Sequence, residues 1–287
     1  MNDESNRGLT NRLLGFPADA RLLIINADDF GMCHAVNVAI GDALQKGFAQ
    51  SATLMAPCPW ALHAMRFLAD HPEIAFGVHL TVISEWELYR WGPLMPKERV
   101  TTLLNETGTF HTFDQMPGFL ANVSFDELEM EFRAQIEVVL AAGLQPTHLD
   151  WHCLRLRGRQ DISALMLKLA REYRLALRVA DQDWSKQVQS QGLPTNDYDL
   201  LDSYQIEPTT KAEFYTELLR NLPAGLSEWA VHPGLDNAEL QSIDPGGSYK
   251  RQTDLDFLTS QQAKKVIEEE GIHLLDYRAL QHVWQNI

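Results

Sequence analysis

Short apolar runs alternate with amphipathic segments along most of the chain. Apolar runs rich in β-branched residues predict strands buried on both faces, and apolar residues spaced three and four apart predict helices. On this basis we predict seven strands, at 22–27, 50–56, 74–80, 146–152, 175–180, 227–232 and 272–275. Helices are predicted at 35–46, 60–69, 124–142, 161–173, 211–222 and 254–270, with a short one at the C-terminus.

Strands and helices that alternate without an internal linker are typical of a parallel α/β domain. Side chains of the metal-ligand type end four of the predicted strands, and a barrel gathers the carboxyl ends of all its strands at one mouth. We therefore predict a distorted, incomplete (β/α) barrel of about seven parallel strands in preference to an open sheet. It is expected to span residues 21–287 as one domain, after a polar leader at residues 1–20.

The alternation breaks between residues 84 and 123, after the third predicted strand, where the chain is rich in Gly, Pro, Asn, Thr and aromatic residues. A connection this long in a compact domain is usually functional, and we expect a lid or a substrate-binding insertion. Trp86 and Trp91 can stack on sugar rings, or can equally well pack the insertion onto the domain. Ser124, with Glu127 three residues later, predicts a capping box at the start of the next helix.

Two adjacent carboxylates, Asp28 and Asp29, end the first predicted strand, and Gly31 follows in a turn. Neighbouring carboxylates repel each other, so we expect a positive group beside them, and a metal ion is the obvious candidate. The alternative is that both acids cap the following helix, which is the commoner role of a single Asp at the end of a strand.

The densest group of polar residues is Thr-His-Leu-Asp-Trp-His at 147–152. His148, Asp150 and His152 occupy alternate positions of a predicted strand and therefore share one face. Buried polar groups are costly unless something satisfies them. Imidazoles and carboxylates bind divalent metals directly, or hold the metal's ligands in place, a role that fits His148 and Asp150.

His79 and His232 end two further predicted strands. The simplest account joins Asp29, His79 and His152 as three metal ligands and leaves positions open for water, as a catalytic site requires. Asp28 is then free to act as a general base and His232 as a general acid. One divalent cation is expected, with Mg or Zn favoured and Mn, Co or Ni as alternatives.

These blocks resemble the signature of the YdjC-like carbohydrate deacetylases. The matching segments are Asn-Ala-Asp-Asp-Phe-Gly at 26–31, Gly-Val-His-Leu at 77–80 and the block at 147–152, with a shorter match, His-Pro-Gly, at 232–234. The resemblance implies a distorted barrel related to the NodB-type polysaccharide deacetylases. It also implies metal-dependent removal of N-acetyl groups from amino sugars, typically in chito-oligosaccharides.

Carried over by position, the resemblance implies Asp29, His79 and His152 as metal ligands and Asp28 as the catalytic base. Arg178 falls where the family often has an arginine, which can orient Asp28, although a structural ion pair is the alternative.

The chain departs from the family after His152, where members usually carry further histidines. Here residues 153–157 read Cys-Leu-Arg-Leu-Arg. The groove beside the three metal ligands is therefore expected to be more apolar and more cationic, with Arg155 as a substrate contact. This departure bears on the identity of the substrate more than on the type of reaction.

The composition narrows the choice of partner. Lys and Arg number 24 against 39 Asp and Glu, a net charge of −15, which disfavours nucleic acid and anionic membranes as partners. The three cysteines lack zinc-type spacing and are expected to be reduced thiols. With no apolar signal-peptide core and no membrane-length apolar run, we expect a soluble cytoplasmic protein that acts on a small carbohydrate, with a homo-oligomer left open.

Three other functions remain open at this point. The same residues suit a metal-dependent hydrolase of another amide, an ester or a phosphate. A metal-free glycosidase is the second alternative, with Asp28 and Asp150 flanking the glycosidic bond. The third is a sugar-binding homologue without catalytic activity.

Overall fold

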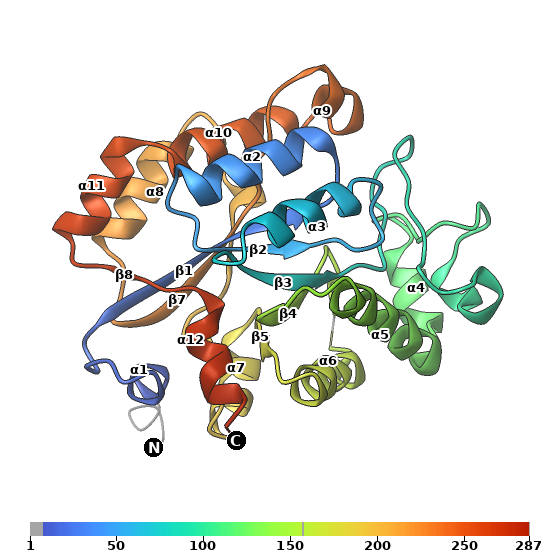
Figure 1. Ribbon diagram of the computed structural model, residues 1–287, viewed down its shortest axis with the longest axis horizontal. Helices are drawn as coiled ribbons and strands as arrows, with labels where there is room; N and C mark the ends of the chain where they lie inside the picture. Colours follow the sequence, from blue (N-terminus) through green and yellow to red (C-terminus); the bar gives the residue numbers. More distant parts are fainter. Residues whose placement is uncertain (1–7, 157, 287) are drawn as a thin grey trace.

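The computed structural model describes residues 8–156 and 158–286 (Figure 1). Its strands form one sheet in the order β5-β4-β3-β2-β1-β7-β6, with β8 paired to β1, and every pair in the sheet is parallel. The strands are β1 (Arg21–Phe30), β2 (Ser51–Leu54), β3 (Ala75–Leu80), β4 (His148–Trp151), β5 (Ala176–Leu177), β6 (Leu201–Asp202), β7 (Gly225–Val231) and β8 (His273–Leu274).

Helices cover the outside of the curved sheet, with α2, α3 and α10 on one side of it and α6 on the other in Figure 1. Helix α12 instead lies at the amino ends of β3 and β4, where Arg278 donates to Pro72 O (3.3 Å) and Gln281 donates to Pro146 O (3.2 Å). The α-helices are α1 (Leu9–Leu13), α2 (His34–Gln45), α3 (Ala61–Asp70), α4 (Met116–Asn122), α5 (Phe125–Ala141), α6 (Gln160–Glu172), α7 (Gln182–Gln189), α8 (Lys211–Arg220), α9 (Ala238–Ile243), α10 (Ser248–Leu258), α11 (Gln261–Glu269) and α12 (Tyr277–Trp284). Short 3₁₀ helices are η1 (Lys97–Arg99), η2 (Thr101–Leu103) and η3 (Ser203–Gln205).

This architecture confirms the predicted distorted, incomplete barrel. The sheet ends at β5 on one side and at β6 on the other, and no ladder joins these two strands within the described ranges. The segments that flank them meet through separate hydrogen bonds, from Leu200 N to Ala180 O (3.1 Å) and from Gln182 N to the Asp199 carboxylate (3.1 Å). A seam therefore runs down the barrel wall between β5 and β6.

Some elements differ from the sequence prediction. Strand β6, only two residues long, was missed because so short a segment carries no readable alternation. The single helix predicted at 254–270 is two helices, α10 and α11, because Ser260 caps a new helix by accepting a hydrogen bond from Ala263 N (3.2 Å). Helices α4, α7 and α9 lie in segments for which no helix was predicted.

The insertion after β3 is tied to α5 by the residues that were expected to form the capping box. Ser124 does cap α5, accepting a hydrogen bond from Glu127 N at 3.4 Å. The Glu127 carboxylate, however, accepts hydrogen bonds from Thr102 N (2.7 Å) and Thr102 Oγ1 (2.8 Å) in the insertion, rather than from Ser124 N. Only the Ser124 half of the capping box therefore forms, and the Glu127 carboxylate instead links η2 to α5.

The expected leader lies partly outside the described residues, which begin at residue 8. Its described part carries α1, where Thr10 and Asn11 are fully buried. Thr10 Oγ1 donates to Thr195 O at 2.7 Å, so this helix packs on the domain. The division at residue 20 stays a prediction. No helix in the described residues is both long enough and apolar enough to cross a membrane.

Inside the barrel, the ring of His148 occupies the space that a glycine leaves open. Gly77 on β3 pairs in register with His148 on β4, and a Cβ added to Gly77 would lie 2.7 Å from three atoms of the ring. The ring also stacks on Tyr277 of α12, with centroids 3.5 Å apart and an angle of 7° between the planes. The imidazole is thus packed tightly between β3 and α12.

A Gly77→Ala substitution is therefore expected to lower the free energy of unfolding by about 1–3 kcal/mol, the usual cost of overpacking a core. Chemical denaturation would measure it. The matched control is Gly118→Ala in α4, where an added Cβ meets no atom within 4 Å. This control is expected to leave stability unchanged or to raise it by up to about 1 kcal/mol. Equal losses in both variants would contradict the packing argument.

Candidate active site

A bulge in β1 brings both of its terminal carboxylates to the barrel mouth. Adjacent residues of a regular strand point to opposite faces. The pairing of β1 with β2 shifts register between Ala27 and Phe30, and Asp29 adopts a positive φ of 74°. Such bulges re-aim side chains next to active sites, and a non-glycine residue at positive φ is uncommon. As a result Asp28 and Asp29 both line one cavity.

Strand β4 presents its alternate residues to the barrel interior, but at different depths. Asp150 lies opposite His79 in the β3–β4 register, and the two side chains are hydrogen-bonded (2.7 Å). His152 follows the end of the strand and lines the cavity. His148 is fully buried, with its ring against Thr147 and Tyr277. Burial and the charge of Arg178 lower its pKa, so this ring is neutral.

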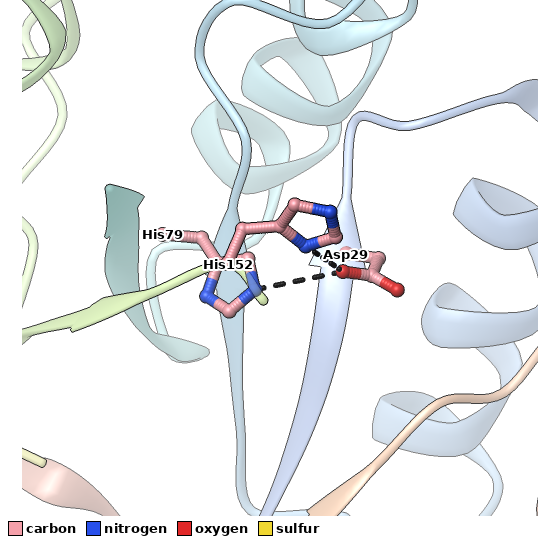
Figure 2. A group of neighbouring side chains, drawn as sticks. All are labelled: Asp29, His79 and His152. Carbon is pink, nitrogen blue, oxygen red and sulfur yellow. Dashed lines mark hydrogen bonds and ion pairs between the residues drawn. The ribbon is translucent and has the colours of Figure 1, made fainter. Parts of the chain in front are cut away.

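The three predicted metal ligands do come together. Asp29, His79 and His152 each place one ligand atom within 4.8 Å of the others, and both imidazoles reach the same carboxylate (Figure 2). Asp29 Oδ1 lies 3.0 Å from His152 Nδ1 and 3.5 Å from His79 Nε2. Two atoms that each lie about 2.1 Å from one tetrahedral zinc ion stand about 3.4 Å apart. One carboxylate and two imidazoles at these distances therefore fit a divalent cation.

Neighbouring groups orient the atoms of this cluster. His79 Nδ1 donates to Asp150, which leaves Nε2 facing Asp29. Arg251 Nη2 donates to Asp29 Oδ2 at 2.7 Å and leaves Oδ1 for the two histidines. Burial disfavours charge on these groups, but Arg251 holds the pKa of Asp29 well below its usual value. In the same way Asp150, Asp29 and Asp28 raise the pKa of His79 to about 9.

Arg178 holds Asp28 as an ionised carboxylate. Its guanidinium donates to both oxygens of Asp28, at 2.7 and 2.9 Å. The same side chain lies 2.6 Å from Asp150 Oδ2 and donates from Nε to Glu228 at 2.7 Å. Burial alone would raise the pKa of Asp28, but the charge of Arg178 lowers it well below the ordinary range. Arg178 thus binds three buried carboxylates, and Asp28 keeps its negative charge.

His232, at the end of β7, is held by a relay of hydrogen bonds. Ser203 Oγ donates its one hydrogen to Asp254 Oδ2 (2.6 Å), because a carboxylate only accepts. The contact of Ser203 Oγ with His232 Nδ1 (2.9 Å) therefore has the imidazole as donor. The charge of Asp254 is balanced by the buried Lys211 (2.9 Å). Nδ1 of His232 thus carries a proton and Nε2 is available to exchange one.

The cavity has a volume of about 460 Å³ and is lined by the acids, the histidines and several aromatic and cationic side chains. Trp86 and Arg155 line it, and Arg155 also lies over the ring of Phe113, with its guanidinium carbon 4.7 Å from the centroid. Trp91 does not line it. That ring is 3% exposed and its Nε1 donates to Ile83 O (2.8 Å), so Trp91 packs the insertion instead of offering a stacking surface. Arg157 lies outside the described residues.

A model of the family described as YdjC-like protein matches residues 22–269. The chain belongs to this family.

Relatives of this YdjC-like protein include a carbohydrate deacetylase of Geobacillus stearothermophilus, 32% identical over 90% of this chain and 97% of its own. A chitooligosaccharide deacetylase of Yersinia enterocolitica is 28% identical over 90% of this chain and 98% of its own. A crystal structure from Enterococcus faecalis V583, described as a cellobiose-phosphate cleavage protein, has a TM-score of 0.77 at 30% identity and covers 91% of this chain and 99% of its own.

Several residues at the site of this YdjC-like protein were not identified from the sequence. Glu228 could have been identified, because a charged residue in the middle of an apolar strand is unusual. In the structure its carboxylate is bound by Arg178 and Tyr277. Arg251 comes from α10 and Glu85 from the insertion, and neither position has a spacing that distinguishes it from a surface charge. Their roles follow from tertiary packing alone.

Proposed function

We propose that this YdjC-like protein is a metal-dependent hydrolase that removes N-acetyl groups from amino sugars or short N-acetylated oligosaccharides. The observation that carries the proposal is the convergence of Asp29, His79 and His152 beside Asp28 and His232 on one cavity. Curated relatives named as carbohydrate and chitooligosaccharide deacetylases support the substrate class. The donor set suits Zn best, while Mg, Mn, Co and Ni are also candidates.

Asp29, His79 and His152 would hold the cation. A divalent cation there supplies Lewis-acid chemistry, which makes water a nucleophile near neutral pH and polarises a carbonyl. Asp28 accepts the proton that the attacking water loses, and Arg178 keeps this carboxylate ionised and fixes its orientation.

His232 completes the reaction at the leaving group. An amine leaves poorly as an anion, so the nitrogen must gain a proton as the C–N bond breaks. His232 lines the cavity, and its Nδ1 is fixed by Ser203, so Nε2 is the atom that donates. Trp86 and Arg155 are then the substrate contacts, with the aromatic ring against the sugar face and the guanidinium toward its hydroxyl groups.

The metal-free glycosidase has less support. It needs Asp28 and Asp150 to flank a glycosidic bond. Asp150 is fully buried and is bound to His79 and Arg178, so its carboxylate does not face the cavity. That alternative also leaves the grouping of His79 with His152 without a role.

The test is release of acetate from N-acetylated mono- and oligosaccharides, together with metal analysis of the purified protein. We expect acetate release that chelation abolishes and added Zn restores. His152→Ala is expected to lose both the bound metal and the activity, whereas His282→Ala, at an exposed position of α12, is expected to retain both.

Each rival gives a distinct outcome in the same assay. Metal-dependent release of phosphate or of an alcohol from an ester, without release of acetate from sugars, would favour another hydrolase. Sugar binding without turnover would favour a binding protein. Full activity after complete removal of the metal would refute the proposal.

A further inference from the structure

A second set of metal-binding donors surrounds His152. Glu85, His152 and Cys153 each place one ligand atom within 4.8 Å of the other two. All three line the same cavity. This set uses the far side of the imidazole, because His152 Nε2 lies 2.8 Å from Glu85 Oε2 while Nδ1 faces Asp29.

Cys153 is the accessible thiol of the chain. It is exposed, whereas Cys33 and Cys58, the other two cysteines, are buried in the hydrophobic core. Cys153 adopts a positive φ of 53°, so the chain leaves β4 at this point without the regular alternation that would direct His152 and Cys153 to opposite sides. A cation that enters the cavity therefore meets this sulfur without any opening of the fold.

The donor set differs in chemistry from the set that holds Asp29 and His79. A thiolate is a soft ligand and selects thiophilic ions, whereas carboxylate and imidazole also accept Mg, Mn or Co. We propose that Glu85, Nε2 of His152 and Cys153 form a second cation site for thiophilic divalent ions, of which Zn²⁺ and Cd²⁺ are examples, and that its occupation withdraws His152 from the set with Asp29 and His79.

The two sites exclude each other through the imidazole. A neutral imidazole has one nitrogen with a lone pair and one that carries a proton. A cation at Nε2 leaves the proton on Nδ1, where it is donated to Asp29 Oδ1 at 3.0 Å, and that nitrogen can no longer bind metal. Without a cation both nitrogens of His152 face carboxylates, which only accept hydrogen bonds, so each nitrogen carries a proton. Binding therefore releases two protons to solvent for each cation bound, one from Nε2 of His152 and one from the thiol of Cys153.

The first experiment is a titration of the purified full-length protein with Cd²⁺, followed by the ultraviolet absorption of the cadmium–thiolate bond. We expect a saturable band that is lost in both Cys153→Ser and Cys153→Ala and kept in Cys33→Ala. Glu85→Gln removes the charge of a direct ligand and is expected to weaken Cd²⁺ binding by at least about tenfold, because loss of an outer partner of a metal site alone costs about 10–100-fold. A band that persists in the Cys153 variants, or none in the unmodified protein, would overturn the proposal.

The second experiment tests the exclusion and rests on the proposed function. Cd²⁺ is expected to inhibit acetate release by the Zn-loaded protein, with at least about tenfold more Cd²⁺ needed in Cys153→Ser, each protein being compared with its own uninhibited rate. A Cys153-dependent band without inhibition would overturn the exclusion. If the band depends on Cys153 but the protein releases no acetate at all, the second cation site is supported and the proposed function is refuted.

Discussion

Replacing Arg178 by methionine is expected to destabilise the protein by about 3–5 kcal/mol, the usual cost of removing one partner from a buried ion pair. The loss follows from the contacts of the guanidinium with Asp28, Asp150 and Glu228, all at 2.6–2.9 Å. Methionine has similar length but no donor, so three buried carboxylates would remain without their common cation. Chemical denaturation of the purified variant would measure the change.

Two further variants separate this effect from the removal of any arginine. Arg66→Met deletes an exposed arginine paired with Asp70 on α3 and is expected to cost at most about 1 kcal/mol, as exposed ion pairs do. Arg178→Lys keeps the charge but lacks the planar fork, so an intermediate loss is expected. A stability of Arg178→Met equal to that of Arg66→Met would show that the carboxylates find other partners.

The second large effect is expected from Asp28→Asn, which should slow acetate release by about 10²–10⁴-fold, the range for loss of a general base. Asparagine has a similar shape and still accepts a hydrogen bond from Arg178, but it cannot take a proton from water. Metal content should stay near that of the unmodified protein, because Asp28 is not one of the three proposed ligands.

The comparison of two acids distinguishes a base from a ligand. Asp29→Asn is expected to lose metal and activity together, whereas Asp28→Asn is expected to lose activity alone. Asp42→Asn, at a partly exposed position of α2 in a pair with Lys46, is the neutral control and should change neither. If Asp28→Asn lost its metal as Asp29→Asn does, the assignment of the base would be wrong.

The sequence was sufficient to predict the barrel and the two histidines of the cluster because both follow from short-range periodicity. Asp29 reaches the cavity through the bulge in β1, which regular alternation does not predict. Apolar strands marked the barrel wall. The alternate positions of Asp150 and His152 placed both residues inside it, and His79 was expected at the same end of a neighbouring strand. These are consequences of backbone geometry that any parallel barrel imposes.

The remaining site residues depend on distances that no local pattern encodes. Arg251 reaches Asp29 across 222 positions of the chain, and Tyr277 reaches Glu228 across 49. His148 was expected to hold a metal ligand in place, yet it packs deeper, between Gly77 and Tyr277. Trp91 illustrates the same limit, since an aromatic residue in an insertion has no sequence feature that separates a buried ring from a stacking surface.

The seam between β5 and β6 has a consequence for the size of ligand that the cavity accepts. Ala180, Leu200 and Asp202, from the two margins of the seam, all line the cavity. The margins are joined there by separate hydrogen bonds. The bond from Leu200 to Ala180 is worth about 0.5–1.5 kcal/mol, and the bond from Gln182 to the Asp199 carboxylate about 1.5–3 kcal/mol. Opening this flank to a bulkier ligand therefore costs less free energy than separating the strand ladders of β1, β3 and β4, at whose ends Asp29, His79 and His152 lie.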